Sequence, residues 1–390
     1  MDWKREKRDY IVKSRRVVVK VGSAVLASGQ GLDLDRVERL AEQLAALHDT
    51  GRDVILVSSG AVAAGRGVMR ATREITTTAL PDKQAAAAIG QSRLMHAYDQ
   101  AFAARGKVSA QVLLTREDVR SRQRFLNARN TFATLLDWRA IPVVNENDTV
   151  AVNELKFGDN DNLSGLLLNL IEADLFINLT SAKGVFDSDP GTNADAKVMD
   201  CIDDIQNLDV NALCGAKTAL GSGGMHSKLR AARRAAQIGV PTYIVPGREE
   251  GILERAFSDP DAMLGTWVCP SEEQITSRKF WLAYNADPAG KLAIDAGAAN
   301  ALVKGGKSLL PAGITDVTGN FGRGALVTIA GPDGADIGVG LCNYSAAELR
   351  RVMGKSLAGH GSGRTPESVE GDAPYAEAVH RDNMLLHAAV

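Results

Sequence analysis

The chain has 390 residues, of which 45% are hydrophobic and 24% are charged, an ordinary balance for a globular protein with two domains or one large one. Its 45 Lys and Arg residues nearly cancel its 47 Asp and Glu residues, which argues against the broad basic surface of nucleic-acid or membrane binders. No apolar run approaches the ~20 residues of a membrane span, so we expect no membrane association. The four cysteines lack CxxC spacing and predict reduced thiols in a cytoplasmic protein, with neither a disulfide framework nor a metal cluster. They are Cys201, Cys214, Cys269 and Cys342.

Apolar runs alternate with amphipathic segments over the first 250 residues, after a polar stretch (residues 1–16) that we interpret as a lead-in. Strands are predicted at residues 17–21, 54–57, 108–114, 141–144, 175–179 and 240–245, and helices at 33–51, 83–104, 123–138, 163–171 and 227–238. The strands are apolar on both faces, which predicts an α/β fold with a parallel sheet between helix layers. Ligands bind at the carboxyl ends of such strands, so the residues that follow each strand are the candidates for a site.

The pattern changes after about residue 248. From residue 275 onward, short apolar runs are separated by Gly and Pro, which is typical of a small, mainly β domain. We therefore expect an α/β domain over residues 1–260 and a second domain over residues 275–390, with the boundary within residues 251–271.

Two lysines stand where they could meet an anion. Lys20 lies in an apolar strand just before Gly22, where burial is costly without an anionic partner, although a strand-end lysine can also reach solvent. Lys228 follows a glycine-rich loop (residues 221–227) into a helix, an arrangement that lets backbone N–H groups approach phosphate. The alternative is a flexible loop with an ordinary surface lysine.

Carboxylates and amides gather after the strand at residues 141–144. Asn145 to Asp148 and Gly158 to Asp161 together hold four carboxylates and three amides. Such groups suit Mg²⁺, a substrate ammonium group, or the positioning of lysines, and the alternative is a solvated polar loop. The chain shows no Ser-His-Asp pattern. Lysines, glycine-rich turns and acidic clusters at strand ends favour phosphoryl transfer, which needs positioning and charge neutralisation rather than a protein nucleophile.

Five motifs lie along the first part of the chain, at residues 20–23, 58–62, 145–148, 157–161 and 223–228. In this order, they resemble the amino-acid kinase family. Residues 80–91 and 125–132 further resemble the members that transfer the γ-phosphoryl group of ATP to the side-chain carboxylate of L-glutamate, giving L-glutamyl 5-phosphate in the first step of proline biosynthesis. Residues 307–324 and 380–384 resemble a PUA domain. The resemblance implies an αβα sandwich with a parallel sheet, followed by a small PUA domain.

The resemblance also implies roles for particular residues. Lys20 and Lys228 would contact phosphates, and Asp161 would hold both lysines in position. Ser59, Asp148 and Asn160 would bind L-glutamate, with Asp148 near its ammonium group. No general base is required, because the attacking carboxylate is ionised at neutral pH. ATP and Mg²⁺ are the expected cofactors, and no metal-ligand set is assigned to the protein. The nucleotide would lie against Lys20, Gly22, Thr180, Ser181, Ser222, Gly223, Gly224, Met225, His226, Ser227 and Lys228.

One position departs from the family. Thr-Asp is usual where this chain has Thr180-Ser181, so the nucleotide contact of that Asp must be changed here.

The resemblance also implies a homo-oligomer, dimeric or tetrameric, and feedback inhibition by L-proline. The C-terminal segment, residues 275–390, holds eleven Lys and Arg residues and eleven Asp and Glu residues. This zero net charge disfavours RNA binding and favours a structural or regulatory role. The alternatives are an acetylglutamate or aspartate kinase of the same family, or an RNA-binding or sensor protein.

Overall fold

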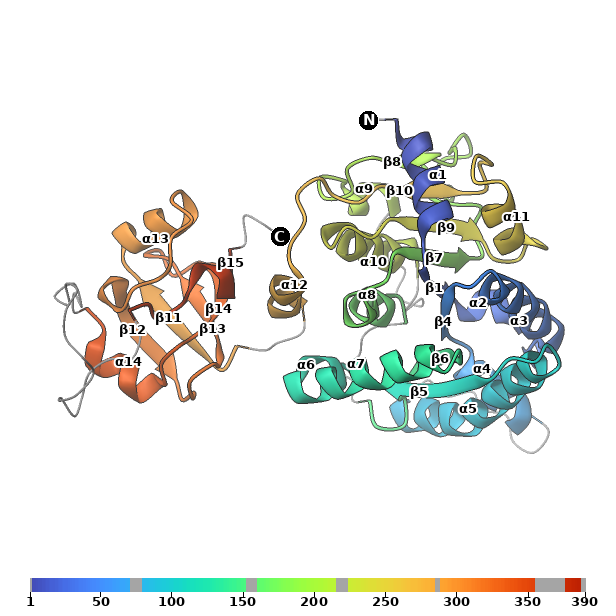
Figure 1. Ribbon diagram of the computed structural model, residues 1–390, viewed down its shortest axis with the longest axis horizontal. Coiled ribbons are helices and arrows are strands. Elements are labelled where there is room, and N and C mark those ends of the chain that lie inside the picture. The colour runs from blue at the N-terminus through green and yellow to red at the C-terminus, as the bar shows by residue number, and fades with distance from the viewer. Residues whose placement is uncertain are drawn as a thin grey trace. The chain divides into compact units, whose positions relative to one another are not determined.

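The structure, a computed structural model, describes residues 2–70, 79–151, 160–214, 224–284, 288–354 and 376–386. It divides into two compact units, Met1–Gln274 and Ile275–Val390 (Figure 1). None of the described helices combines the length and apolar character that a membrane crossing requires.

The first unit contains an eight-stranded sheet with the order β5-β6-β4-β1-β7-β9-β10-β8. Its neighbouring strands run parallel, except that β10 is antiparallel to β9. This arrangement confirms the predicted α/β fold with a mostly parallel sheet. The strands are β1 (Arg16–Val21), β4 (Asp53–Ser58), β5 (Ser109–Leu114), β6 (Ile141–Glu146), β7 (Leu175–Thr180), β8 (Cys201–Ile202), β9 (Thr242–Pro246) and β10 (Thr266–Val268).

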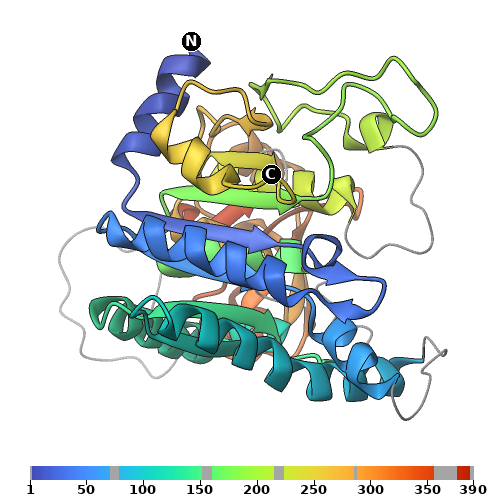
Figure 2. The same cartoon turned by 90° about the vertical axis from the view of Figure 1, so that its right-hand side faces the viewer.

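Helices cover both faces of this sheet, which explains why its strands are apolar throughout. Alternate residues of the central strands, such as Val19 and Ile177, join one core with α3, α5 and α11, and Figure 2 shows α3 lying across this face. The residues between them, such as Val18 and Phe176, are also fully buried, and α8 and α10 pack on that side. The helices are α1 (Trp3–Lys13), α2 (Ser23–Leu26), α3 (Leu34–Asp49), α4 (Ala61–Met69), α5 (Leu80–Ala103), α6 (Arg116–Arg120), α7 (Arg122–Asp137), α8 (Asn160–Ile171), α9 (Val210–Cys214), α10 (Met225–Gln237) and α11 (Ile252–Ser258), and β2 (Ala27–Ser28) pairs with β3 (Gly31–Leu32).

Two segments differ from the expectations drawn from the sequence. The N-terminal stretch is not a polar lead-in but the helix α1, capped by Asp2 and anchored by buried Ile11 in the core. Most residues of α1 are charged and only one stripe of the helix, with Lys7 and Ile11, is buried, so the sequence looks polar. The segment expected to hold the domain boundary contains α11 and β10, and β10 pairs with β9, so the first unit runs past residue 260 to Gln274.

The second unit has its own sheet and its own apolar core. Its strand order is β12-β11-β13-β14-β15, with β11 and β13 parallel and the other pairs antiparallel. This agrees with the small, mainly β fold predicted for the C-terminal part. The elements are α12 (Ser277–Tyr284), β11 (Gly290–Ile294), α13 (Ala296–Val303), β12 (Ile314–Gly319), β13 (Leu326–Ala330), β14 (Asp336–Leu341), α14 (Ala346–Val352) and β15 (Met384–Leu386).

Helices α4 and α5 pack with their backbones in direct contact. A Cβ atom added at Gly65 would lie 1.8 Å from the carbonyl oxygen of Ala86, and one added at Gly90 would lie 1.8 Å from that of Ala61. Both helices begin beside the carboxyl ends of the strands, so this contact sets the position of whatever side chains they carry there.

We expect Gly65→Ala and Gly90→Ala each to lower the free energy of unfolding by about 3 kcal/mol, because the new methyl group forces the two helices apart. Gly165→Ala in α8 is the matched control, since its Cβ meets no atom closer than 3.5 Å. The control should gain up to about 1 kcal/mol from helix propensity. Urea unfolding measures all three variants, and wild-type stability of Gly65→Ala would contradict the close contact.

Candidate active site

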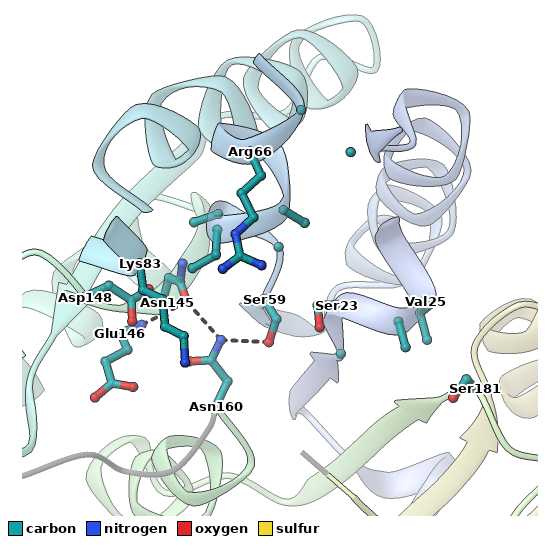
Figure 3. A pocket seen from close by; sticks show the side chains of 18 of the residues that line it. Ser23, Val25, Ser59, Arg66, Lys83, Asn145, Glu146, Asp148, Asn160 and Ser181 are labelled. Carbon is teal, nitrogen blue, oxygen red and sulfur yellow. Dashed lines mark hydrogen bonds between the residues drawn. The ribbon is translucent and has the colours of Figure 1, made fainter. Parts of the chain in front are cut away.

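A cavity of about 680 Å³ lies at the carboxyl ends of four neighbouring strands, β6, β4, β1 and β7. This size is within the range of small-molecule sites, about 300–1,000 Å³. Residues that follow those strands line it, among them Gly22 and the side chains of Ser59, Asp148 and Ser181, which Figure 3 labels. The edge of the sheet that the sequence marked as the ligand side therefore carries the cavity.

A buried carboxylate joins two buried ammonium groups at this cavity. Asp161, in the first turn of α8, accepts from Lys20 Nζ of β1 at 2.5 Å and from Lys228 Nζ of α10 at 3.1 Å. The Asp161 side chain is 0% exposed, and those of Lys20 and Lys228 are 3% and 6% exposed. Asn178 Nδ2 and Ser227 Oγ donate to the two carboxylate oxygens at 3.1 and 2.6 Å. The structure thus brings together the three residues expected to be catalytic.

Electrostatics keep Asp161 ionised. Burial by itself would raise the pKa of Asp161, but the charges of Lys20 and Lys228, with hydrogen bonds from Lys20 and Ser227, outweigh burial and hold the pKa well below its usual range. The three groups together carry one net positive charge. Lys20 and Lys228 also line the cavity, so the excess charge favours an anionic ligand there.

The four acceptor positions of the Asp161 carboxylate already receive four donors. Asp161 therefore does not fit the role of a ligand to Mg²⁺. The other carboxylates that line the cavity belong to the end of β6, where Glu146 is the last residue of the strand and Asp148 lies two residues beyond it. Among the residues that the structure describes, those around Lys20 and Lys228 offer no carboxylate cage for a metal.

Asn160 connects the polar residues on the β4 and β6 side of the cavity. Its Nδ2 atom donates to Ser59 Oγ at 2.9 Å, to Ser58 O at 3.1 Å and to Asn145 Oδ1 at 2.8 Å. Its Oδ1 atom is buried and has no hydrogen-bond partner among the described residues. A buried acceptor of this kind is costly to the fold. Asp148 lines the same cavity (Figure 3).

The cations on the far wall of the cavity were not predicted from the sequence. Arg66 of α4 and Lys83 of α5 both line it, and Figure 3 shows Arg66 extending into it. Arg70, at the end of α4, lines it as well. In the sequence, each of these residues resembles an ordinary solvent-exposed charge on a helix. Only the backbone contact between α4 and α5, signalled by Gly65 and Gly90, places these side chains beside the site.

The residues expected to bind the nucleotide are only partly brought together. Gly22, Thr180 and Ser181 line the cavity with the two lysines. Thr180 is buried at the end of β7, and Ser181 is exposed. The described residues Gly224, Met225, His226 and Ser227 do not line this cavity, and Ser227 instead contacts Asp161. Ser222 and Gly223 lie outside the described residues.

Comparisons with known proteins define the class. The model of the amino acid kinase family matches residues 15–246, and that of the PUA domain matches residues 290–358. The glutamate 5-kinase of Oleidesulfovibrio alaskensis is 58% identical over 392 residues, and that of Nitratidesulfovibrio vulgaris strain DP4 is 56% identical over 390, each alignment covering 100% of both chains. The glutamate 5-kinase of Maridesulfovibrio salexigens is 55% identical over 379 residues, covering 97% of this chain and 98% of the relative. The chain belongs to the amino acid kinase family and, within it, to the glutamate 5-kinases.

We expect Asp161→Asn to lower the free energy of unfolding by about 3–5 kcal/mol, because two buried ammonium groups lose their counter-charge. A carboxylate whose folded pKa is depressed stabilises the protein above its unfolded pKa and loses that effect as the pH falls toward the folded value. The difference from wild type should therefore be constant above about pH 4 and shrink below it. Adding Lys228→Met to Asp161→Asn should restore part of the loss. Equal stability of Asp161→Asn and wild type in urea would contradict the ion-pair geometry.

Proposed function

We propose that this chain transfers the γ-phosphoryl group of ATP to the side-chain carboxylate of L-glutamate, giving L-glutamyl 5-phosphate and ADP. The observation that carries the proposal is the pair of buried ammonium groups held by Asp161 at the cavity, in a chain 58% identical to a glutamate 5-kinase over its whole length. A carboxylate oxygen of glutamate attacks the γ-phosphorus, and the bond from that phosphorus to the β–γ bridging oxygen breaks. No proton moves, because the nucleophile is already a carboxylate.

Charge neutralisation is the task of the protein in this reaction. The transferred group spreads negative charge over its oxygens in the transition state, and fixed cations stabilise that charge without reorganising. Lys20 and Lys228 supply two such cations from different elements, β1 and α10. Asp161 fixes where both ammonium groups lie, so it acts as a positioning residue. Magnesium would enter with the phosphates of ATP, since Mg²⁺ commonly binds through substrate phosphates and retained waters.

The remaining polar groups of the cavity match the charges of glutamate. Asp148 suits the α-ammonium group, Arg66 and Lys83 suit a carboxylate, and Ser59 and Asn160 line the same cavity as further polar contacts for L-glutamate. N-acetylglutamate has no ammonium group to meet Asp148, and a polar site that binds an ammonium group strongly disfavours an analogue that lacks it. Aspartate is one methylene shorter, so its side-chain carboxylate does not reach the same distance from Asp148.

The proposal also covers where the nucleotide binds, inhibition by L-proline and the oligomeric state. Thr180, Ser181 and Gly22 lie on the side of the lysines and would contact ATP. L-proline carries an ammonium and a carboxylate like the α-carbon end of glutamate, so it would compete for the same groups. Its inhibition, a homo-oligomeric state and a cytoplasmic location stay predictions from family membership.

A hydroxamate assay tests the substrate. Purified protein with ATP, Mg²⁺ and hydroxylamine should yield hydroxamate when L-glutamate is the substrate. It should yield no hydroxamate with N-acetylglutamate or with aspartate. In the matched variant Asp148→Asn, the KM for L-glutamate should rise while the variant keeps its fold. Hydroxamate from N-acetylglutamate alone would assign the chain to a different substrate, and no hydroxamate from folded protein with any substrate would contradict the proposed reaction.

Lys228→Ala should lower kcat by about 10²- to 10³-fold, with a smaller change in the KM for glutamate, because its charge is needed most in the transition state. Steady-state kinetics with ATP and L-glutamate measure both constants. Arg230→Ala is the control, since it removes an exposed cation from the same helix and should leave kcat unchanged. Equal kcat values for Lys228→Ala and wild type would exclude the assigned role.

A further inference from the structure

Two cysteines that are 68 residues apart in the sequence meet at the far end of the first sheet. Cys201 lies in β8, and Cys269 follows the last residue of β10. Their Sγ atoms are 3.6 Å apart, and these atoms and a carboxylate oxygen of Asp203 all lie within 4.8 Å of one another. The sequence predicted no thiol cluster, because neither cysteine has a second one nearby in the chain. The cluster is remote from the substrate cavity, none of whose lining residues belongs to it.

The pairing of two short strands creates this cluster. β8 and β10 run parallel with Cys201 opposite Trp267, and the N–H group of Cys269 continues the ladder by donating to the carbonyl of Ile202 at 3.0 Å. Cys269 therefore lies opposite Asp203. Because side chains alternate along a strand, Cys201, Asp203 and Cys269 share one face of the sheet. The backbone thus holds the three side chains in place without help from a ligand.

The geometry favours a bridging metal ion over a disulfide. The two cysteines are offset by two residues on neighbouring strands, which places their Cα atoms about 8 Å apart. A disulfide spans at most about 7 Å between Cα atoms, so it would require the backbone to move. Two thiolates on one tetrahedral Zn²⁺, with bonds of about 2.3 Å, lie about 3.8 Å apart. The observed 3.6 Å is close to that separation.

The three side chains of the cluster differ in how deeply they are buried. Cys269 is buried, Cys201 is half-buried and Asp203 is exposed, so the cluster has an apolar base and an opening to solvent. Lys7 of α1 is buried nearby and interacts electrostatically with Cys201, while its ammonium group donates to the carbonyl of Ala262 at 2.6 Å. The carboxylates of Asp261, Asp259 and Asp200 interact with Lys7 more strongly, so this ammonium group is not counted as part of the site.

We propose that Cys201, Asp203 and Cys269 bind one thiophilic divalent cation, with Zn²⁺ as the natural ligand and a fourth position open to solvent. Sulfur ligands select such an ion over Mg²⁺, so this site is independent of the metal that accompanies ATP. β8 has only two residues and lies at the edge of the sheet. A bound ion would therefore fasten this short edge strand to β10 by a cross-link between side chains.

The test uses the reduced, full-length protein after treatment with a chelator. Co²⁺ is the probe, because thiolate ligands give it a charge-transfer absorption that carboxylates and imidazoles do not. We expect one Co²⁺ per chain with this absorption, and its displacement by one equivalent of Zn²⁺. Cys201→Ser and Cys269→Ser should each weaken binding at least about tenfold, since each removes a ligand of the metal. Cys342→Ser, which removes a buried thiol of the second unit, is the matched control and should bind as wild type does.

Three results would overturn the proposal. They are the absence of thiolate absorption in wild type, equal binding by wild type and both cysteine variants, and rapid formation of a Cys201–Cys269 disulfide with oxidised glutathione that releases two reduced glutathione molecules. Circular dichroism checks that each variant is folded. Should Cys269→Ser not fold, Cys201→Ser and Asp203→Asn decide the outcome, because both alter side chains nearer the surface.

Discussion

The substrate cavity depends on the placement of one ionised carboxylate in the interior of the first unit. Three elements that are distant in the sequence, β1, α8 and α10, each contribute one member of the Lys20–Asp161–Lys228 set. Neither lysine is tolerable at its depth without Asp161, and Asp161 is not tolerable without them. The interaction is therefore both a packing constraint on the central layer and the source of the excess positive charge at the cavity, which we propose binds phosphate.

The fold could be predicted from the sequence where its residues interact with near neighbours. Continuous apolar runs identified the central strands, and Asp33, which caps α3, marked the start of a helix. Because parallel strands end at one edge, the chain order of strands and loops is enough to predict that Gly22, Ser59 and Asp148 converge. Asp161 needed the family resemblance, since its spacing alone also allowed a metal ligand or a solvated loop.

Other features depend on contacts between distant segments and leave no local signal. Helix α1 looks polar because a single stripe, with Ile11, is buried against the core. Arg66 and Lys83 enter the cavity only because α4 and α5 pack backbone to backbone. Cys201 and Cys269 meet because β8 and β10 are neighbours in the sheet order, although spacing in the sequence gives no hint of it.

The first turn of α8 has a consequence for how the two substrates interact. Asn160 forms hydrogen bonds on the side of the cavity that we propose for glutamate, and the next residue, Asp161, holds the lysines on the side that we propose for phosphate. Because the two residues are adjacent, the backbone fixes the distance between the glutamate side and the phosphate side of the proposed site. Any tilt of α8 displaces both Asn160 and Asp161, so a ligand bound beside one of these residues also restricts the motion of the other. The two substrates are thereby expected to bind with positive cooperativity, transmitted through a single helical turn rather than across the whole fold.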